Sequence, residues 1–138
     1  MALAALARRE HSCLELRRKL SAKGFRETVI EGELQRLTEE RLQDDGRFAE
    51  AYIRYRAGSG YGPVKIRVEL KQRGIDEGLA GRSFAQADID WQERVGTAWQ
   101  KKFGIVATQF KERAKQSRFL QYRGFTSDQI SGLLGSEY

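Results

Sequence analysis

The chain has 138 residues, 40% of them hydrophobic and 32% charged, with a net charge of +6 at pH 7. This length fits one domain, or a few small units that share a core, and the composition excludes a disordered chain. One proline, one cysteine, no secretory signal and no long apolar run predict a cytoplasmic, all-helical protein without an internal disulfide or a membrane-spanning helix.

Three helices are predicted in the first part of the chain. Ser12 and Glu15 have the spacing of a capping box, which predicts a helix over about 13–23. Apolar residues at helical spacing predict a second helix over about 27–41. The acidic pair at 44–45 favours a helix N-terminus, so we expect a third helix to follow it.

The middle of the chain shows the same order of elements. Pro63 suits the first turn of a helix, and this helix should end at Gly74. Asp76 is the expected cap of a second helix, which its glycines weaken. Asp88 or Asp90 is the expected cap of a third helix, which contains both tryptophans.

In the C-terminal part we expect one long helix over about 111–123. Thr126 and Gln129 have capping-box spacing and predict a short helix after it. Of the connectors, the glycine-rich segment 58–62 is predicted to be a flexible hinge. Segment 104–108 is too apolar for a free linker, so we expect it to pack.

A register of 50 residues runs through the sequence. Gly24, Gly74 and Gly124 are each preceded by a basic residue and followed by an apolar one, as at a helix end where glycine takes a left-handed conformation. The register predicts an all-α fold of three tandem three-helix repeats, elongated and curved, that share their cores. The expected repeats are residues 1–58, 59–104 and, as an incomplete last repeat, 105–138.

The residue types needed for catalysis or metal binding are scarce. His11 is the only histidine, and without a nucleophile and an orienting carboxylate it forms no triad; we expect it at the surface or at a helix start. Cys13 is expected to be a small buried residue. One histidine and one cysteine cannot supply the usual ligands of zinc. The sequence therefore predicts no enzyme, no metal site and no cofactor.

Basic helix faces are the better candidates for function. The excess of positive charge grows toward the C-terminus, where residues 96–138 carry seven basic and three acidic side chains. Such faces favour a polyanion, and tyrosines at positions 55, 61 and 122 are candidates for stacking on bases. The candidate binding residues are Arg17, Arg18, Lys23, Lys65, Arg67, Lys71, Arg73, Lys111, Lys115, Arg118 and Arg123.

Several segments, in order along nearly the whole chain, resemble one protein family. They are REHSCLELRRKLSAKGF at 9–25, LQDDGRFAEAYIRYRAGSG at 42–60, GYGPVKIRVELKQRGI at 60–75 and AKQSRFLQYRGF at 114–125. With these segments the sequence resembles RecX, the small bacterial regulator of the RecA recombinase.

The resemblance implies a function and a partner. RecX proteins bind the groove of the RecA–DNA filament, where they block its extension or promote its disassembly. They thereby inhibit ATP hydrolysis, strand exchange and coprotease activity in homologous recombination, DNA repair and the SOS response. The expected partners are the RecA nucleoprotein filament and, for some members, single- or double-stranded DNA, with the protein a monomer. A DNA-binding helix-turn-helix protein, sequence-specific or nonspecific, is the alternative.

Overall fold

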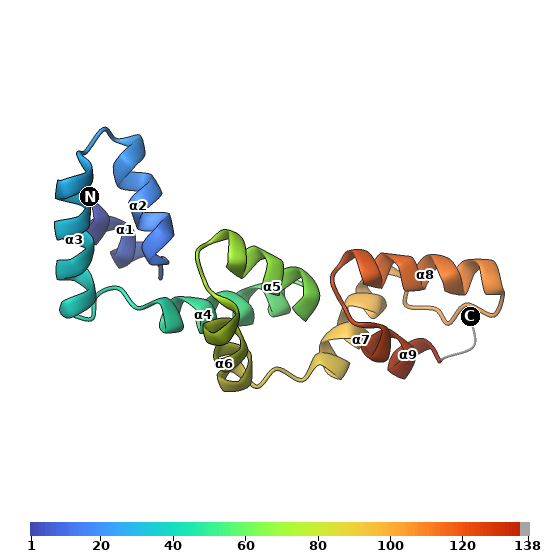
Figure 1. Cartoon of the computed structure of the whole chain (residues 1–138). Coiled ribbons are helices and arrows are strands. Elements are labelled where there is room, and N and C mark those ends of the chain that lie inside the picture. Colours follow the sequence, from blue (N-terminus) through green and yellow to red (C-terminus); the bar gives the residue numbers. More distant parts are fainter. Residues whose placement is uncertain (136–138) are drawn as a thin grey trace. The chain divides into compact units, whose positions relative to one another are not determined.

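The computed structural model describes residues 1–135, and this part of the chain is helical without strands (Figure 1). The helices are α1 (Ala2–Arg8), α2 (Cys13–Ala22), α3 (Glu27–Glu39), α4 (Asp45–Gly58), α5 (Pro63–Gln72), α6 (Glu77–Ala87), α7 (Trp91–Lys102), α8 (Phe110–Tyr122) and α9 (Ser127–Leu134). The prediction of an all-α fold is confirmed. None of the described helices is both long and apolar enough to cross a membrane.

The chain forms two compact units. Unit 1 consists of residues 1–52 and 70–87, and unit 2 consists of residues 53–69 together with the chain from residue 88 onward. The core of unit 1 contains a cluster in which α1, α2 and α3 pack together: Ala2, Ala5, Leu16, Leu20, Ile30, Leu34 and Leu37. Helix α1 was not predicted, because it has seven residues and its N-cap, Met1, makes no side-chain capping bond that could announce it.

The predicted helix starts are confirmed by their capping bonds. Ser12 Oγ accepts a bond of 3.1 Å from the Glu15 amide, and the Glu15 carboxylate accepts one of 3.0 Å from the Ser12 amide. Thr126 and Gln129 form the same capping box at α9. Aspartates cap three further helices, because each side chain accepts a bond from the amide three residues later. They are Asp44 for α4, Asp76 for α6 and Asp90 for α7.

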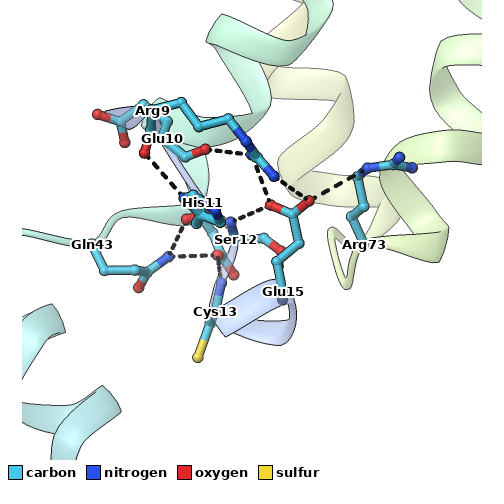
Figure 2. A network of polar contacts seen from close by, with 9 residues as sticks. Arg9, Glu10, His11, Ser12, Cys13, Glu15, Gln43 and Arg73 are labelled. Atoms are coloured by element: carbon cyan, nitrogen blue, oxygen red, sulfur yellow. Dashed lines mark hydrogen bonds and ion pairs between the residues drawn. The ribbon is translucent and has the colours of Figure 1, made fainter. Parts of the chain in front are cut away.

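A polar network joins the start of α2 to the start of α4 within unit 1 (Figure 2). His11, directly before the N-cap, is only 2% exposed, so it lies at a helix start but not at the surface. Its Nδ1 donates to the Arg9 carbonyl at 3.0 Å, and its own carbonyl accepts a bond of 3.3 Å from Gln43. The carboxylate of Asp45 completes the network, since it accepts bonds of 2.8 Å from both the Cys13 amide and Gln43.

Burial shifts the pKa values of His11 and Cys13, which lie in this network. The pKa of His11 lies below 6.5, because burial disfavours the imidazolium more than the hydrogen bond to Arg9 favours it. Burial and the neighbouring Asp45 carboxylate raise the pKa of the Cys13 thiol. Cys13 packs against the unit 1 cluster but is only partly buried, whereas full burial was expected.

The core of unit 2 contains a cluster to which α7, α8 and α9 contribute. Its buried members are Val95, Ala98, Leu120, Phe125 and Ile130, with the side chains of Trp91 and Trp99 packed against them. Gln116 is buried at the register position that Leu16 and Ile66 occupy in the earlier repeats. Its side chain accepts a bond of 3.0 Å from the Trp99 indole and donates one of 3.2 Å to the Ile105 carbonyl, so burial leaves neither end unpaired.

The α7–α8 connector differs from its prediction. We expected segment 104–108 to pack, but the side chains of Ile105 and Val106 are exposed. The connector is held instead through its backbone, by the bond from Gln116 to the Ile105 carbonyl. The apolar sequence predicted burial of these side chains. A bond from the Gln116 side chain to a backbone carbonyl holds the connector while they stay exposed.

The lowered pKa of His11 predicts a specific dependence of stability on pH. As the pH falls below about 6.5, the unfolded chain takes up a proton before folded His11 does. The free energy of unfolding should therefore be fully retained above pH 6.5 and decline as the pH falls from there toward the folded pKa. His11→Gln should flatten this part of the profile, because the chain has no other histidine. Urea denaturation between pH 5 and 8 measures the free energy of unfolding at each pH. If its slope against pH is the same in the variant, the assignment to His11 is contradicted.

Candidate functional site

The N-terminus of α5 meets the C-terminus of α8 within unit 2. The Gly62 amide donates to the Arg123 carbonyl at 2.7 Å, and the Val64 amide donates to the Gly124 carbonyl at 2.9 Å. The first amides and last carbonyls of a helix have no partner inside it, and they carry opposite partial charges. This junction satisfies both helix ends at once. Segment 58–62, which was predicted to be a flexible hinge, is thus bonded at its last residue to the end of α8.

Glycine is required on both sides of this junction. Gly124 has a left-handed φ of +95°, and a Cβ there would lie 2.4 Å from Cβ of Lys65. A Cβ on Gly62 would lie 2.4 Å from the Gly124 carbonyl carbon and from the Phe125 amide nitrogen. Because these neighbours are mostly backbone atoms, they cannot rotate away. The close approach places Lys65 of α5 beside the last turns of α8.

Two adjacent hollows open on unit 2 and share Phe119 and Arg123. One, of about 490 Å³, is lined by Tyr61, Lys65, Lys115, Arg118, Phe119, Tyr122 and Arg123. The other, of about 180 Å³, is lined by residues 57–60 and by Arg94, Thr97, Ala98, Lys101, Lys102, Phe119 and Arg123. We call their basic side chains the cationic surface: Lys65, Arg94, Lys101, Lys102, Lys115, Arg118 and Arg123. Within the described chain, neither hollow is lined by an acidic residue.

The face that α8 presents to the first hollow follows from its helical spacing. Lys115, Arg118 and Tyr122 lie at positions i, i+3 and i+7, which fall on one side of a helix. Gln116 and Leu120 are buried on the other side. The face combines two cations with Tyr122, whose side chain is 87% exposed. An exposed aromatic ring between cations can stack on a planar group while the cations bind its phosphates.

Aromatic rings hold the central arginine between the hollows. The Arg123 guanidinium lies 4.8 Å from the ring centre of Tyr61 and 5.0 Å from that of Phe119. Lys102 lies over the same Phe119 ring at 5.5 Å. These cation–π contacts position positive charge without neutralising it. Arg56, which also lies over Tyr61, differs because Glu69 binds it through two bonds of 2.9 Å.

The structure brings together four of the predicted binding residues: Lys65, Lys115, Arg118 and Arg123. Lys111 is exposed on α8, and Arg67 lies on α5, but neither lines a hollow. The other predicted residues belong to unit 1: Arg17, Arg18, Lys23, Lys71 and Arg73.

The predicted basic face of α2 is largely engaged inside unit 1. Arg17 forms ion pairs with Glu27 and Glu31, which cancel its charge locally. Arg18 donates to the Gln72 carbonyl at 3.2 Å. Sequence reasoning missed Arg94, Lys101 and Lys102 of the cationic surface, although the adjacent lysines at the end of α7 were a visible signal. Their clustering with α8 depends on tertiary packing that spacing within α7 does not reveal.

The chain matches three family models. Residues 1–37 match the first three-helix domain of RecX, residues 44–82 the second and residues 88–134 the third. The chain belongs to the RecX family. Regulatory protein RecX of Pseudomonas fluorescens Pf-5 is 49% identical over 130 residues, which cover 94% of this chain and 84% of the relative. Regulatory protein RecX of Pseudomonas putida GB-1 is 48% identical over 94% of this chain and 83% of the relative.

Solved RecX structures share the fold. The crystal structure of RecX from Lactobacillus salivarius matches with a TM-score of 0.77 at 22% sequence identity, over 95% of this chain and 88% of that chain. A second RecX crystal structure gives the same TM-score over 98% of this chain and 68% of that chain. The family models and the curated relatives therefore make this chain a regulatory protein of the RecX family.

The RecX domains have the same 50-residue register as the predicted repeats, but their boundaries lie at different helices. In each domain the glycine-ended helix, α2, α5 or α8, is the middle one of three. The predicted repeats 1–58, 59–104 and 105–138 instead place α4 and α7 at the end of the first and second repeats. The third RecX domain accordingly contains α7, α8 and α9.

Because of the junction of α5 and α8, we expect alanine to destabilise the protein at Gly62 but not at nearby Gly58. Gly62→Ala should lower the free energy of unfolding by roughly 2–3 kcal/mol, because its Cβ meets backbone atoms that cannot move aside. Gly58→Ala is the matched control, since a Cβ there has nothing within 4 Å and alanine favours the helix. Urea denaturation of both variants measures the difference, and equal stability would contradict the assigned junction.

Proposed function

We propose that this chain is a negative regulator of the RecA recombinase. It binds the groove of the RecA–DNA filament and blocks its extension or promotes its disassembly. It thereby inhibits ATP hydrolysis, strand exchange and coprotease activity in recombination, DNA repair and the SOS response, in the cytoplasm. Membership of the RecX family supports the regulatory role, and the cationic surface is the observation that carries the binding site.

The charge of this surface suits a filament that contains DNA. Seven basic side chains line two adjoining hollows without an acidic neighbour in the described chain. Such a surface attracts phosphates, and its contribution to affinity falls as salt rises. It also complements acidic side chains of a protein partner, which chiefly increases the association rate. The binding unit is one copy of the chain.

Direct binding to single-stranded DNA is the second candidate function, and Tyr122 favours it. The ring is exposed beside Lys115 and Arg118, an arrangement that recurs where proteins stack bases and bind the adjoining phosphates. Sequence-specific readout of a duplex is less well supported. It needs one recognition helix in the major groove, whereas the cations of this surface come from α5, α7 and α8 and the segment after α8.

Charge reversal on the cationic surface tests the proposal. We expect the triple variant Lys65→Glu, Lys115→Glu, Arg118→Glu to weaken inhibition of DNA-dependent ATP hydrolysis by the cognate RecA about 100-fold or more, because repulsion replaces attraction. The matched control, Arg8→Glu, Lys19→Glu, Arg82→Glu, changes the net charge equally at exposed positions of unit 1. It should inhibit nearly as well as the unmodified chain.

The assay uses excess single-stranded DNA, so that inhibition below the stoichiometry of RecA reports filament regulation. Circular dichroism first establishes that both variants are folded. Full inhibition by the folded surface variant would refute the assigned surface, and no inhibition by the unmodified chain at equimolar RecA would refute the proposed function. Fluorescence anisotropy with a single-stranded oligonucleotide then distinguishes direct DNA binding from binding through RecA.

A further inference from the structure

Three equivalent helix ends in this chain differ in how they are covered. Gly24, Gly74 and Gly124 all adopt a left-handed φ, between +85° and +95°. The apolar residue that follows is 2% exposed at Ile75 and 3% exposed at Phe125, but 46% exposed at Phe25. The register is the same, so the difference lies in what packs against each end.

The two covered ends are contacted by the first turn of another glycine-ended helix. At Gly74 a Cβ would lie 2.8 Å from Cβ of Leu14, the second residue of α2. At Gly124 a Cβ would lie 2.4 Å from Cβ of Lys65, the third residue of α5. In each case the contacting helix belongs to the preceding RecX domain. A Cβ on Gly24, which lies in the first RecX domain, would have nothing within 4 Å.

The end of α2 also has unused acceptors. At the end of α8, the Arg123 and Gly124 carbonyls accept amides from the start of α5. The corresponding carbonyls of Lys23 and Gly24 accept no such backbone bond from the described chain, which distinguishes the end of α2 from that of α8. We call this end the α2 corner, defined by Lys23, Gly24 and Phe25. It lacks the first turn of a helix that covers both of its equivalents.

Of the three helices α2, α5 and α8, one has a first turn that covers no such end in the described part of the chain. It is α8, which begins at Phe110 with its side chain 67% exposed. Its N-cap, Gln109, makes no side-chain capping bond, so the first amides of α8 still lack that partner. The exposed side chains of Ile105 and Val106 precede this turn and add apolar surface.

The charges of the two ends are complementary. Glu15, the third residue of α2, lies 3.7 Å from Arg73, which precedes Gly74. The third residue of α8 is Glu112, and Lys23 precedes Gly24. Placing the first turn of α8 on the α2 corner would therefore pair Glu112 with Lys23, as Glu15 pairs with Arg73.

We propose that the α2 corner of one copy of this chain binds the first turn of α8 of a second copy. The two surfaces differ, so the contact is head-to-tail and can add further copies in a series. It is small, so the chain is a monomer in dilute solution and associates when copies are concentrated, for example side by side on a common polymer. This inference goes beyond the proposed function and does not rest on RecA or DNA.

Cross-linking between two variants tests the contact. Both carry Cys13→Ala; one adds Arg26→Cys and the other Gln109→Cys, at N-cap positions whose side chains make no capping bond. Mixed at about 1 mM and treated with a short bismaleimide, they should give a cross-linked dimer. Each variant alone should give at least tenfold less, because a head-to-tail contact does not place equivalent residues together.

A charge swap makes the assignment specific. Lys23→Glu in the first variant should reduce the yield at least fivefold, and adding Glu112→Lys to the second should restore it. Lys19→Glu, in the same last turn of α2, is the matched control and should change little. No mixed dimer at 1 mM, equal linking of either variant alone, or a yield indifferent to Lys23→Glu would overturn the proposal. These results involve no RecA, so they stand apart from the ATP hydrolysis assay.

Discussion

The hydrogen bonds from the first turn of α5 to the last carbonyls of α8 are the contact on which the cationic surface depends. Two helix ends of opposite partial charge each supply what the other lacks, and burial of the pair costs little because both are satisfied. The contact requires glycine at 62 and at 124, since a side chain at either place would meet atoms of the opposite segment. It thereby brings Tyr61 and Lys65 beside α8.

The local structure was readily predicted, because it rests on short-range chemistry. Helix starts were predicted correctly from their caps. These are the capping boxes at Ser12 and Thr126 and the aspartate caps of α4, α6 and α7. The glycine register predicted the ends of α2, α5 and α8. The α7–α8 connector failed because composition predicts burial only on average, and a single bond from Gln116 to a carbonyl was enough to hold the backbone with its apolar side chains exposed.

The sequence predicted part of the cationic surface, namely Lys65, Lys115, Arg118 and Arg123. Cations at helical spacing on α8 identified Lys115 and Arg118, but spacing treats every basic face alike. It therefore also selected Arg17, whose charge is cancelled by two glutamates of α3. The sequence alone did not predict that the cations of α7 lie near those of α8, because this proximity depends on how the unit 2 core packs. The difference between the two faces is the absence of acidic neighbours in the described hollows, which only tertiary structure reveals.

A regulator of this kind acts by where it binds, and we propose that the cationic surface contacts the RecA–DNA filament. Acetylation footprinting of lysines, read by mass spectrometry, tests it most directly with the unmodified chain. In the filament complex, Lys65, Lys101, Lys102 and Lys115 should be protected, while Lys19 on α2 of unit 1 should react as in the free protein. Protection of Lys19 with unchanged reactivity of the four surface lysines would contradict the account.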